Sequence, residues 1–138
     1  MKLTSLFAAC VAALALSACG GDNEFKATLS GGAERPNPIT TNGTGSVTAT
    51  LNDKTLTVNG TFSNLSAAAS AAHIHGPADK ENIADVVCPL TATANNGGTL
   101  TGTCTFTDAQ VQALRDGKLY VNVHTSTNPT GELRGQLE

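Results

Sequence analysis

The chain has 138 residues, with 8 Lys and Arg against 11 Asp and Glu, which gives a formal net charge of −3. This length fits one ordinary domain once an N-terminal export segment is removed. The sequence has no basic run and no Trp, which argues against a nucleic-acid surface and against platforms that stack sugars or bases. We therefore expect no nucleic-acid partner.

The first residues read as an export signal. Lys2 precedes an apolar run, residues 6–16, which is too short for a membrane span of about 20 residues. The run ends in Leu-Ser-Ala-Cys at residues 16–19, which resembles the bacterial lipobox, where the chain is cut before a cysteine that becomes acylated. An ordinary signal peptide followed by an incidental cysteine is the alternative.

The lipobox divides the chain into three parts. We expect residues 1–18 to be a signal peptide, 19–24 a tether that begins at the lipidated Cys19, and 25–138 the folded domain. The protein would then sit outside the cytoplasm in a bacterial cell envelope, bound to the membrane through its N-terminal lipid. Gly20 after the cysteine favours the outer membrane over the inner one, by the sorting rule of enterobacteria.

From Phe25 onward, apolar and polar residues alternate with the period of two that is typical of strands. We expect strands at residues 25–29, 44–51, 55–62, 73–75, 83–90, 100–106, 119–125 and 131–137. The Ala- and Ser-rich stretch 64–71 is interpreted as a connection that crosses between sheets. About eight short strands separated by turn residues predict an antiparallel, Greek-key-like β-sandwich or barrel.

One segment breaks this period. Thr107 and Gln110 form a capping box, and Asp108 suits the positive end of a helix. An apolar stripe follows, and Gly117 supplies the stop. The pattern predicts a single short helix over residues 108–116.

Two cysteines remain after removal of the signal peptide and acylation of Cys19. Cys88 and Cys104 flank the turn sequence Asn-Asn-Gly-Gly at residues 95–98. Folding a hairpin about position 96 places residues whose numbers sum to 192 opposite each other, so the two cysteines face across the ladder at a separation that suits a disulfide. Outside the cytoplasm such a bond is permitted. A metal site with two cysteine ligands is the alternative.

The chain has only three histidines. His73 and His75 share one face of a strand, and Ile74 faces the opposite side. In the strand 119–125, His124 likewise lies opposite the aliphatic residues. If the two strands are neighbours, the three imidazoles converge and suit one Cu, Zn or Ni ion with an open fourth position. The alternative is that the rings are structural and tie loops to strands.

A metal-bound imidazole is usually oriented through its second nitrogen. Asn122, Glu132 and Glu34 are the candidates for this role. Glu132 and Arg134, at positions i and i+2 of the last strand, should share a face and either pair across the sheet or orient His124.

These segments in this order resemble the CHRD (chordin) domain, found in chordin and in secreted microbial proteins. The matching segments are FKATLSG at 25–31, AAHIHGPA at 71–78, TDAQVQAL at 107–114, LYVNVHT at 119–125 and GELRGQL at 131–137. The resemblance covers almost all of residues 25–137 and implies an extracellular all-β module with no settled enzymatic activity. The segment ERPNP at 34–38 departs from the Glu-Val-Pro-Pro type of the family.

We therefore expect a lipid-anchored, non-enzymatic binding module that engages a protein partner or holds one Cu or Zn ion through His73, His75 and His124. A copper enzyme similar to superoxide dismutase is one alternative, although a dinuclear site of that class uses about six histidines and this chain has three. A purely structural envelope protein is the other.

Overall fold

The computed structural model describes residues 23–138. The predicted signal peptide 1–18 and the predicted lipidation site Cys19 lie outside the described residues. The elements are β1 (Glu24–Ser30), a 3-10 turn η1 (Gly31–Ala33), β2 (Thr44–Asn52), β3 (Thr55–Ser63), β4 (Ala69–His75), β5 (Val86–Ala92), β6 (Gly98–Thr105), α1 (Asp108–Arg115), β7 (Tyr120–Thr125) and β8 (Leu133–Gln136).

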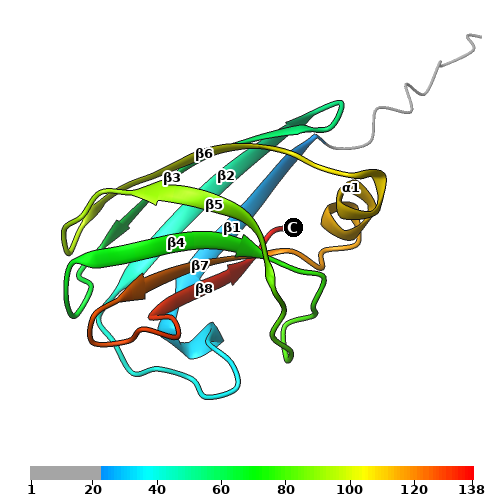
Figure 1. The fold of residues 1–138 in the computed structure, drawn as a ribbon. Helices are drawn as coiled ribbons and strands as arrows, with labels where there is room; N and C mark the ends of the chain where they lie inside the picture. Colours follow the sequence, from blue (N-terminus) through cyan, green and yellow to red (C-terminus); the bar gives the residue numbers. More distant parts are fainter. Residues whose placement is uncertain (1–22) are drawn as a thin grey trace, which may run out of the picture.

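The eight strands form a closed antiparallel barrel in the order β1-β2-β3-β6-β5-β4-β7-β8 (Figure 1). The predicted all-β class with one short helix is confirmed. Of the two architectures that the sequence left open, the chain forms the barrel, because the last strand returns beside the first. Within the described residues, no helix is both long and apolar enough to cross a bilayer.

The barrel interior holds the core. Alternation along each strand sends the apolar side chains inward, as the period of two requires. The inward residues include Leu29, Val47, Ala49, Leu51, Leu56, Val58, Phe62, Ala72, Ile74, Leu100, Val121, Val123 and Leu133. Leu114 of α1 joins the same core, and Figure 1 shows the helix at one end of the barrel. The predicted capping box is present: Gln110 N–H donates to Thr107 Oγ1, and Thr107 N–H donates to Gln110 Oε1.

The barrel consists of two four-stranded halves joined by two thin seams. The threonine half comprises β1, β2, β3 and β6, and the histidine half comprises β5, β4, β7 and β8. Between β5 and β6, only Thr91–Thr101 and Ala92–Leu100 pair. Between β1 and β8, only Ser30–Arg134 pairs, supplemented by backbone hydrogen bonds between Lys26 and Glu138. The barrel thus retains some of the two-layer character of a sandwich.

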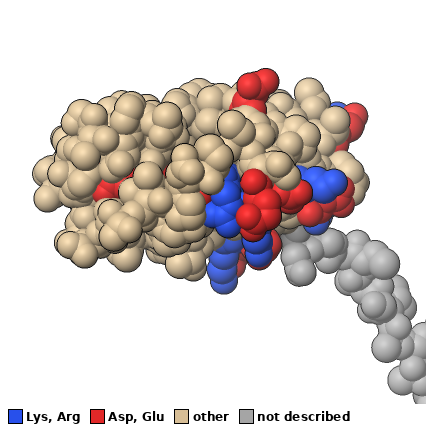
Figure 2. All heavy atoms as spheres, turned by 90° about the horizontal axis from the view of Figure 1, so that it is seen from below, with Lys and Arg blue, Asp and Glu red and all other residues tan. Residues whose placement is uncertain are grey.

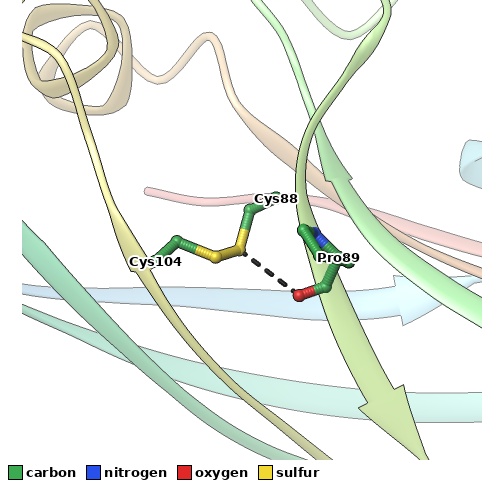
Figure 3. Close-up of a disulfide and its surroundings, with 3 residues drawn as sticks. All are labelled: Cys88, Pro89 and Cys104. Atoms are coloured by element: carbon green, nitrogen blue, oxygen red, sulfur yellow. Dashed lines mark hydrogen bonds between the residues drawn. A yellow bond between two sulfur atoms is a disulfide. The ribbon is translucent and has the colours of Figure 1, made fainter.

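The predicted disulfide Cys88–Cys104 forms, with a Cα–Cα distance of 6.1 Å (Figure 3). The β5–β6 pairs obey the register expected for a hairpin folded about position 96. The disulfide follows the same register beyond the point where the ladder stops. It therefore provides a covalent link across this thin seam.

Several element boundaries differ from the predicted ones by one to four residues, and three of these shifts change how a segment is assigned. β4 begins at Ala69, inside the stretch 64–71 assigned to a connection, because pairing with β7 overrides the weak strand propensity of Ala and Ser. β5 begins at Val86, and Ile83 is 64% exposed in the preceding loop. β1 begins at Glu24, the last residue assigned to the tether.

Candidate functional site

The three histidines lie on the outer face of the histidine half. His73 and His75 are on β4, His124 is on β7, and these two strands are hydrogen-bonded neighbours. Because Ile74 and Val123 point into the core, alternation directs the imidazoles outward. One ligand atom from each ring lies within 4.8 Å of the other two. The structure therefore brings together the three side chains that the sequence singled out.

The closest pair is His73 and His124. His73 Nδ1 lies 3.2 Å from His124 Nε2, and the ring centroids are 5.0 Å apart. The His75 centroid lies 5.5 Å from that of His73 and 6.1 Å from that of His124. All three rings are half-buried. The cluster is compact but still reachable from solvent.

Backbone carbonyls orient two of the rings. His75 Nδ1 lies 3.0 Å from the carbonyl oxygen of Ala84, and His124 Nδ1 lies 3.0 Å from that of Pro129. A carbonyl can only accept, so both Nδ1 atoms carry the proton and both Nε2 atoms carry a lone pair. His75 Nε2 is buried and has no hydrogen-bond partner. Buried polar atoms without a hydrogen-bond partner are rare, and the lone pair of this nitrogen is available for a metal ion.

The surroundings keep these two rings neutral. Burial is the main cause that lowers the pKa of His75 and of His124 below the usual value, and charge on His73 would lower both further. The bonds to Ala84 and Pro129 act in the opposite direction but are weaker. Neutral imidazole is the form that binds metals.

Tyr120 supports His75 from the neighbouring strand. Its ring stacks on the His75 ring, with centroids 5.0 Å apart and an interplanar angle of 5°. The Arg134 guanidinium of β8 lies over the same tyrosine ring, 3.7 Å from its centroid. Since β7 lies between β4 and β8, a cation–π stack links the histidine cluster to the last strand.

Glu34 and Asn122 form a second buried polar pair. Asn122 Nδ2 donates to Glu34 Oε1 at 2.5 Å and to the Leu133 carbonyl at 3.0 Å. Burial raises the pKa of Glu34 to about 7, although the Asn122 bond and the Arg134 charge lower it. A Cβ at Gly131, whose φ is +136°, would lie 2.6 Å from Asn122 Nδ2 and 2.7 Å from the Glu34 carboxylate. Only glycine leaves room for this pair.

Glu132 lies at one end of the barrel and accepts five hydrogen bonds from neutral groups. The donors are Thr41 Oγ1, Ser66 N, Ser66 Oγ, Thr125 Oγ1 and Asn128 Nδ2, at 2.6–3.1 Å. Burial by itself would raise the pKa of Glu132, but these bonds outweigh it and lower the pKa to about 2. The carboxylate thus ties the loops that hold Thr41 and Ser66 to the connection between β7 and β8.

Glu34, Asn122 and Glu132, the residues expected to orient the histidine rings, do not contact them by hydrogen bonds. Within residues 23–138, the hydrogen bonds of Glu34, Asn122 and Glu132 go to one another, to the backbone or to hydroxyl and amide groups, and none goes to an imidazole. Arg134 does not orient His124 either: its guanidinium donates to the backbone carbonyls of Asp79 and Asn82. The carbonyls of Ala84 and Pro129 take the orienting role.

Comparison with protein families identifies the family of this chain. A model of the CHRD domain matches residues 25–137. This range includes all eight strands, except that β1 begins one residue earlier, at Glu24. Searches of curated proteins and of solved structures found no match. The match spans well over half of the chain and includes all three histidines, and the chain belongs to the CHRD domain family.

Proposed function

We propose that this CHRD domain is a non-enzymatic binding module that holds one Cu or Zn ion through His73, His75 and His124. The observation that carries the proposal is the convergence of three imidazole nitrogens within 4.8 Å. In His75 and His124, the Nδ1 hydrogen bonds to backbone carbonyls leave a lone pair on Nε2. Imidazole suits both metals. Both described cysteines are in the disulfide, so histidine is the available ligand type at this site.

The distances suit a mononuclear centre. Two nitrogens bound to zinc at ~2.0–2.1 Å in a tetrahedral arrangement lie roughly 3.3 Å apart. The nearest nitrogens of His73 and His124 are 3.2 Å apart, so this pair is already spaced for a shared ion. Closing the third edge needs a shift of at most about 1.5 Å, within reach of a side-chain rotation. Three nitrogens leave one coordination position open.

Without the metal, a proton lies between His73 Nδ1 and His124 Nε2, the two nitrogens that would share the ion. Because His124 Nε2 carries the lone pair, His73 Nδ1–H is the donor between the two rings. A metal ion that takes both nitrogens requires the other neutral tautomer of His73, with the proton on Nε2, so the proton moves within the ring and neutral imidazoles release no net proton on binding. We expect affinity to be high at pH 7 and to fall in acid as the imidazoles protonate. The lowered pKa values of His75 and His124 extend the binding range toward lower pH.

The test is metal uptake by residues 20–138, which contain every strand and the helix. Elemental analysis and Cu(II) and Zn(II) titration should find about one equivalent in the wild type. His75→Ala and His124→Ala should each reduce affinity at least roughly tenfold, and Thr103→Ala, on the outer face of the threonine half, should leave it unchanged. Uptake below about a tenth of an equivalent would exclude the site. Superoxide consumption above background in the copper-loaded protein would contradict the non-enzymatic part.

Membrane attachment through Cys19 is the second part of the proposal, and its support is the lipobox-like sequence at residues 16–19. Cys19→Ser in the full chain should move the protein from the membrane fraction to the soluble fraction. The matched control is Ser17→Ala, which keeps the cysteine. Unchanged membrane retention of the Cys19→Ser protein would contradict the anchor.

A further inference from the structure

A hollow of about 430 Å³ lies over the β8–β1 seam, and none of the three histidines lines it. Outward side chains of β1 and β8 form its floor, and the loops that carry Arg35 and Lys80 form its walls. Its lining consists of Lys26, Thr28, Ala33, Arg35, Lys80, Glu81, Arg134, Gly135, Gln136 and Glu138.

The hollow gathers positive charge in an acidic protein. Four of the seven Lys and Arg in residues 23–138 line it, against two acidic residues, so its lining has a net charge of +2. Arg35 pairs with Glu81 and Lys80 with Glu138, but both glutamates are more than half exposed, and such pairs hold weakly. Figure 2 shows Lys and Arg gathered in one area beside Asp and Glu, while the left part of that face carries few charges.

Arg134 is the unusual member of this lining. It is only 2% exposed, and among the ion pairs of the described residues it has none. Its Nη2 donates to the carbonyls of Asp79 and Asn82 at 3.0 and 2.8 Å, but its Nη1 is buried and has no partner. A buried cation with an unused N–H is costly to maintain unless an anion reaches it.

Gln136 presents a second unused atom in the same lining. Its Nε2 donates to the carbonyls of Ala78 and Gly117, which fixes the orientation of the amide. Its Oε1 is buried without a partner and needs a hydrogen-bond donor. Two side chains that line the hollow, on the same outward face of β8, thus each hold one buried polar atom without a partner: a cationic donor on Arg134 and a neutral acceptor on Gln136.

We propose that this hollow binds a phosphate group that carries or adjoins a hydrogen-bond donor. The phosphate oxygens accept from Arg134 Nη1 and from the flanking ammonium of Lys26, and a P–OH or an adjacent ammonium donates to Gln136 Oε1. A guanidinium matches phosphate geometry better than a lysine does. A carboxylate alone would leave the glutamine oxygen unsatisfied, so phosphate compounds with a donor are the better fit.

Such a group can be free in solution or part of a lipid headgroup. Cys19 is four residues before Asn23, a reach of at most about 14 Å, and Lys26 follows closely on β1. A membrane anchored at Cys19 would thus lie near the hollow. This choice of source rests on the lipid anchor proposed above, but the phosphate site itself does not.

The experiment titrates residues 20–138 with O-phosphoethanolamine and with inorganic phosphate at low ionic strength, by calorimetry and by amide NMR shifts. We expect saturable shifts at β1 and β8, with chloride at equal ionic strength producing none. Lys26→Glu, at a side chain that is 70% exposed, should weaken binding roughly tenfold. Its matched control, Lys54→Glu, also removes an exposed paired lysine and should have no effect.

Arg134→Gln should abolish phosphate binding if the variant folds, and Lys26→Glu gives the answer if it does not. Vesicles of phosphatidylethanolamine with phosphatidylglycerol, compared with phosphatidylcholine, separate the two sources: retention on the first assigns the lipid, and binding of soluble phosphate alone assigns a free ligand. Phosphate affinity weaker than about 10 mM, or equal loss in Lys26→Glu and Lys54→Glu, would overturn the proposal. His75→Ala should retain phosphate binding, so failure here and failure of the metal site are distinguishable.

Discussion

The two halves of the barrel share one core but present different outer faces. On β2, β3 and β6 of the threonine half, the outward side chains include Thr44, Ser46, Thr48, Thr50, Thr55, Thr57, Asn59, Thr61, Ser63, Thr99, Thr101, Thr103 and Thr105, nearly all of them exposed. On β4, β7 and β8 of the histidine half, the outward residues are buried or half-buried, except Ser70 at an irregularity of β4. The loop residues Glu34, Asp79, Asn82, Ala84 and Pro129 bond to them.

This difference shows what converts a strand surface into a site. Inward residues such as Val58 and Val121 are equally buried in both halves, so the core does not distinguish them. Loop coverage does, because it removes water, lowers the pKa of His75 and His124 and supplies fixed carbonyl acceptors. Hydroxyl groups left in water on the threonine half are satisfied by solvent and need no partner.

The largest difference in unfolding free energy should be between variants of two glutamates, Glu132 and Glu24. Glu132→Ala leaves five donors without their acceptor and should lower the free energy of unfolding by at least about 4 kcal/mol. Glu24→Ala, which breaks an exposed pair with Lys26, should change it by less than about 0.5 kcal/mol. Urea unfolding measures both. Similar losses in the two variants would contradict the distinction.

Glu132 also predicts an acid transition. Its folded-state pKa of about 2 lies below the ordinary value of 4.5, so its ionised form stabilises the fold above about pH 4.5. This stabilisation is lost as the pH falls from about 4.5 through 2. Unfolding free energies measured across this range should fall in the wild type and remain flatter in Glu132→Gln. Parallel curves would assign the acid sensitivity to other carboxylates.

The disulfide tests the junction of the halves. Reduction should lower the unfolding free energy by about 3 kcal/mol, the typical value for a loop of this size, which spans 16 residues. The double variant Cys88→Ala/Cys104→Ala should show no response to reductant. If reduction has no effect on the wild type, the thin β5–β6 ladder is sufficient by itself.

Glu34 should have a smaller effect on the unfolding free energy, with a pH dependence opposite to that of Glu132. Its pKa of about 7 exceeds the ordinary value of 4.5, so the folded state favours the protonated form and loses stability as the pH rises from about 4.5 through 7. Glu34→Gln keeps the acceptor for Asn122 without the charge. It should raise the unfolding free energy at pH 8 by roughly 1–3 kcal/mol and have little effect at pH 4. Destabilisation at pH 8 would show that the ionised carboxylate is needed.

The smallest effect should come from the threonine half itself. Thr57→Ala and Thr103→Ala lie opposite each other on β3 and β6 and should each change the unfolding free energy by within about 0.5 kcal/mol. Metal and phosphate binding should both be unchanged. A loss of either ligand in these variants would show that this face takes part in function.

The features predictable from sequence were those encoded in local spacing. Strand alternation, the capping box at Thr107, the Cys88–Cys104 register and the shared face of His73 and His75 all depend on short intervals along the chain. The orienting groups could not be found in this way, because the carbonyls of Ala84 and Pro129 have no residue-specific signature. Glu132 was expected to orient a histidine ring, but in the structure it accepts hydrogen bonds from Thr41, Ser66 and the β7–β8 connection. The sequence could not show this, because these segments meet only in the folded barrel.

The two thin seams also bear on how the protein opens. Amide hydrogens at the β5–β6 and β8–β1 junctions should exchange through partial opening, whereas those within each half should require global unfolding. Because the disulfide restrains the first seam, we expect β8–β1 to open more readily, since one bridge pair and the Lys26–Glu138 backbone bonds close the barrel there. Arg134, whose Nη1 has no hydrogen-bond partner, lines the hollow over that seam. A ligand bound there would stabilise the closed seam and slow the hydrogen exchange of backbone amides in β1 and β8.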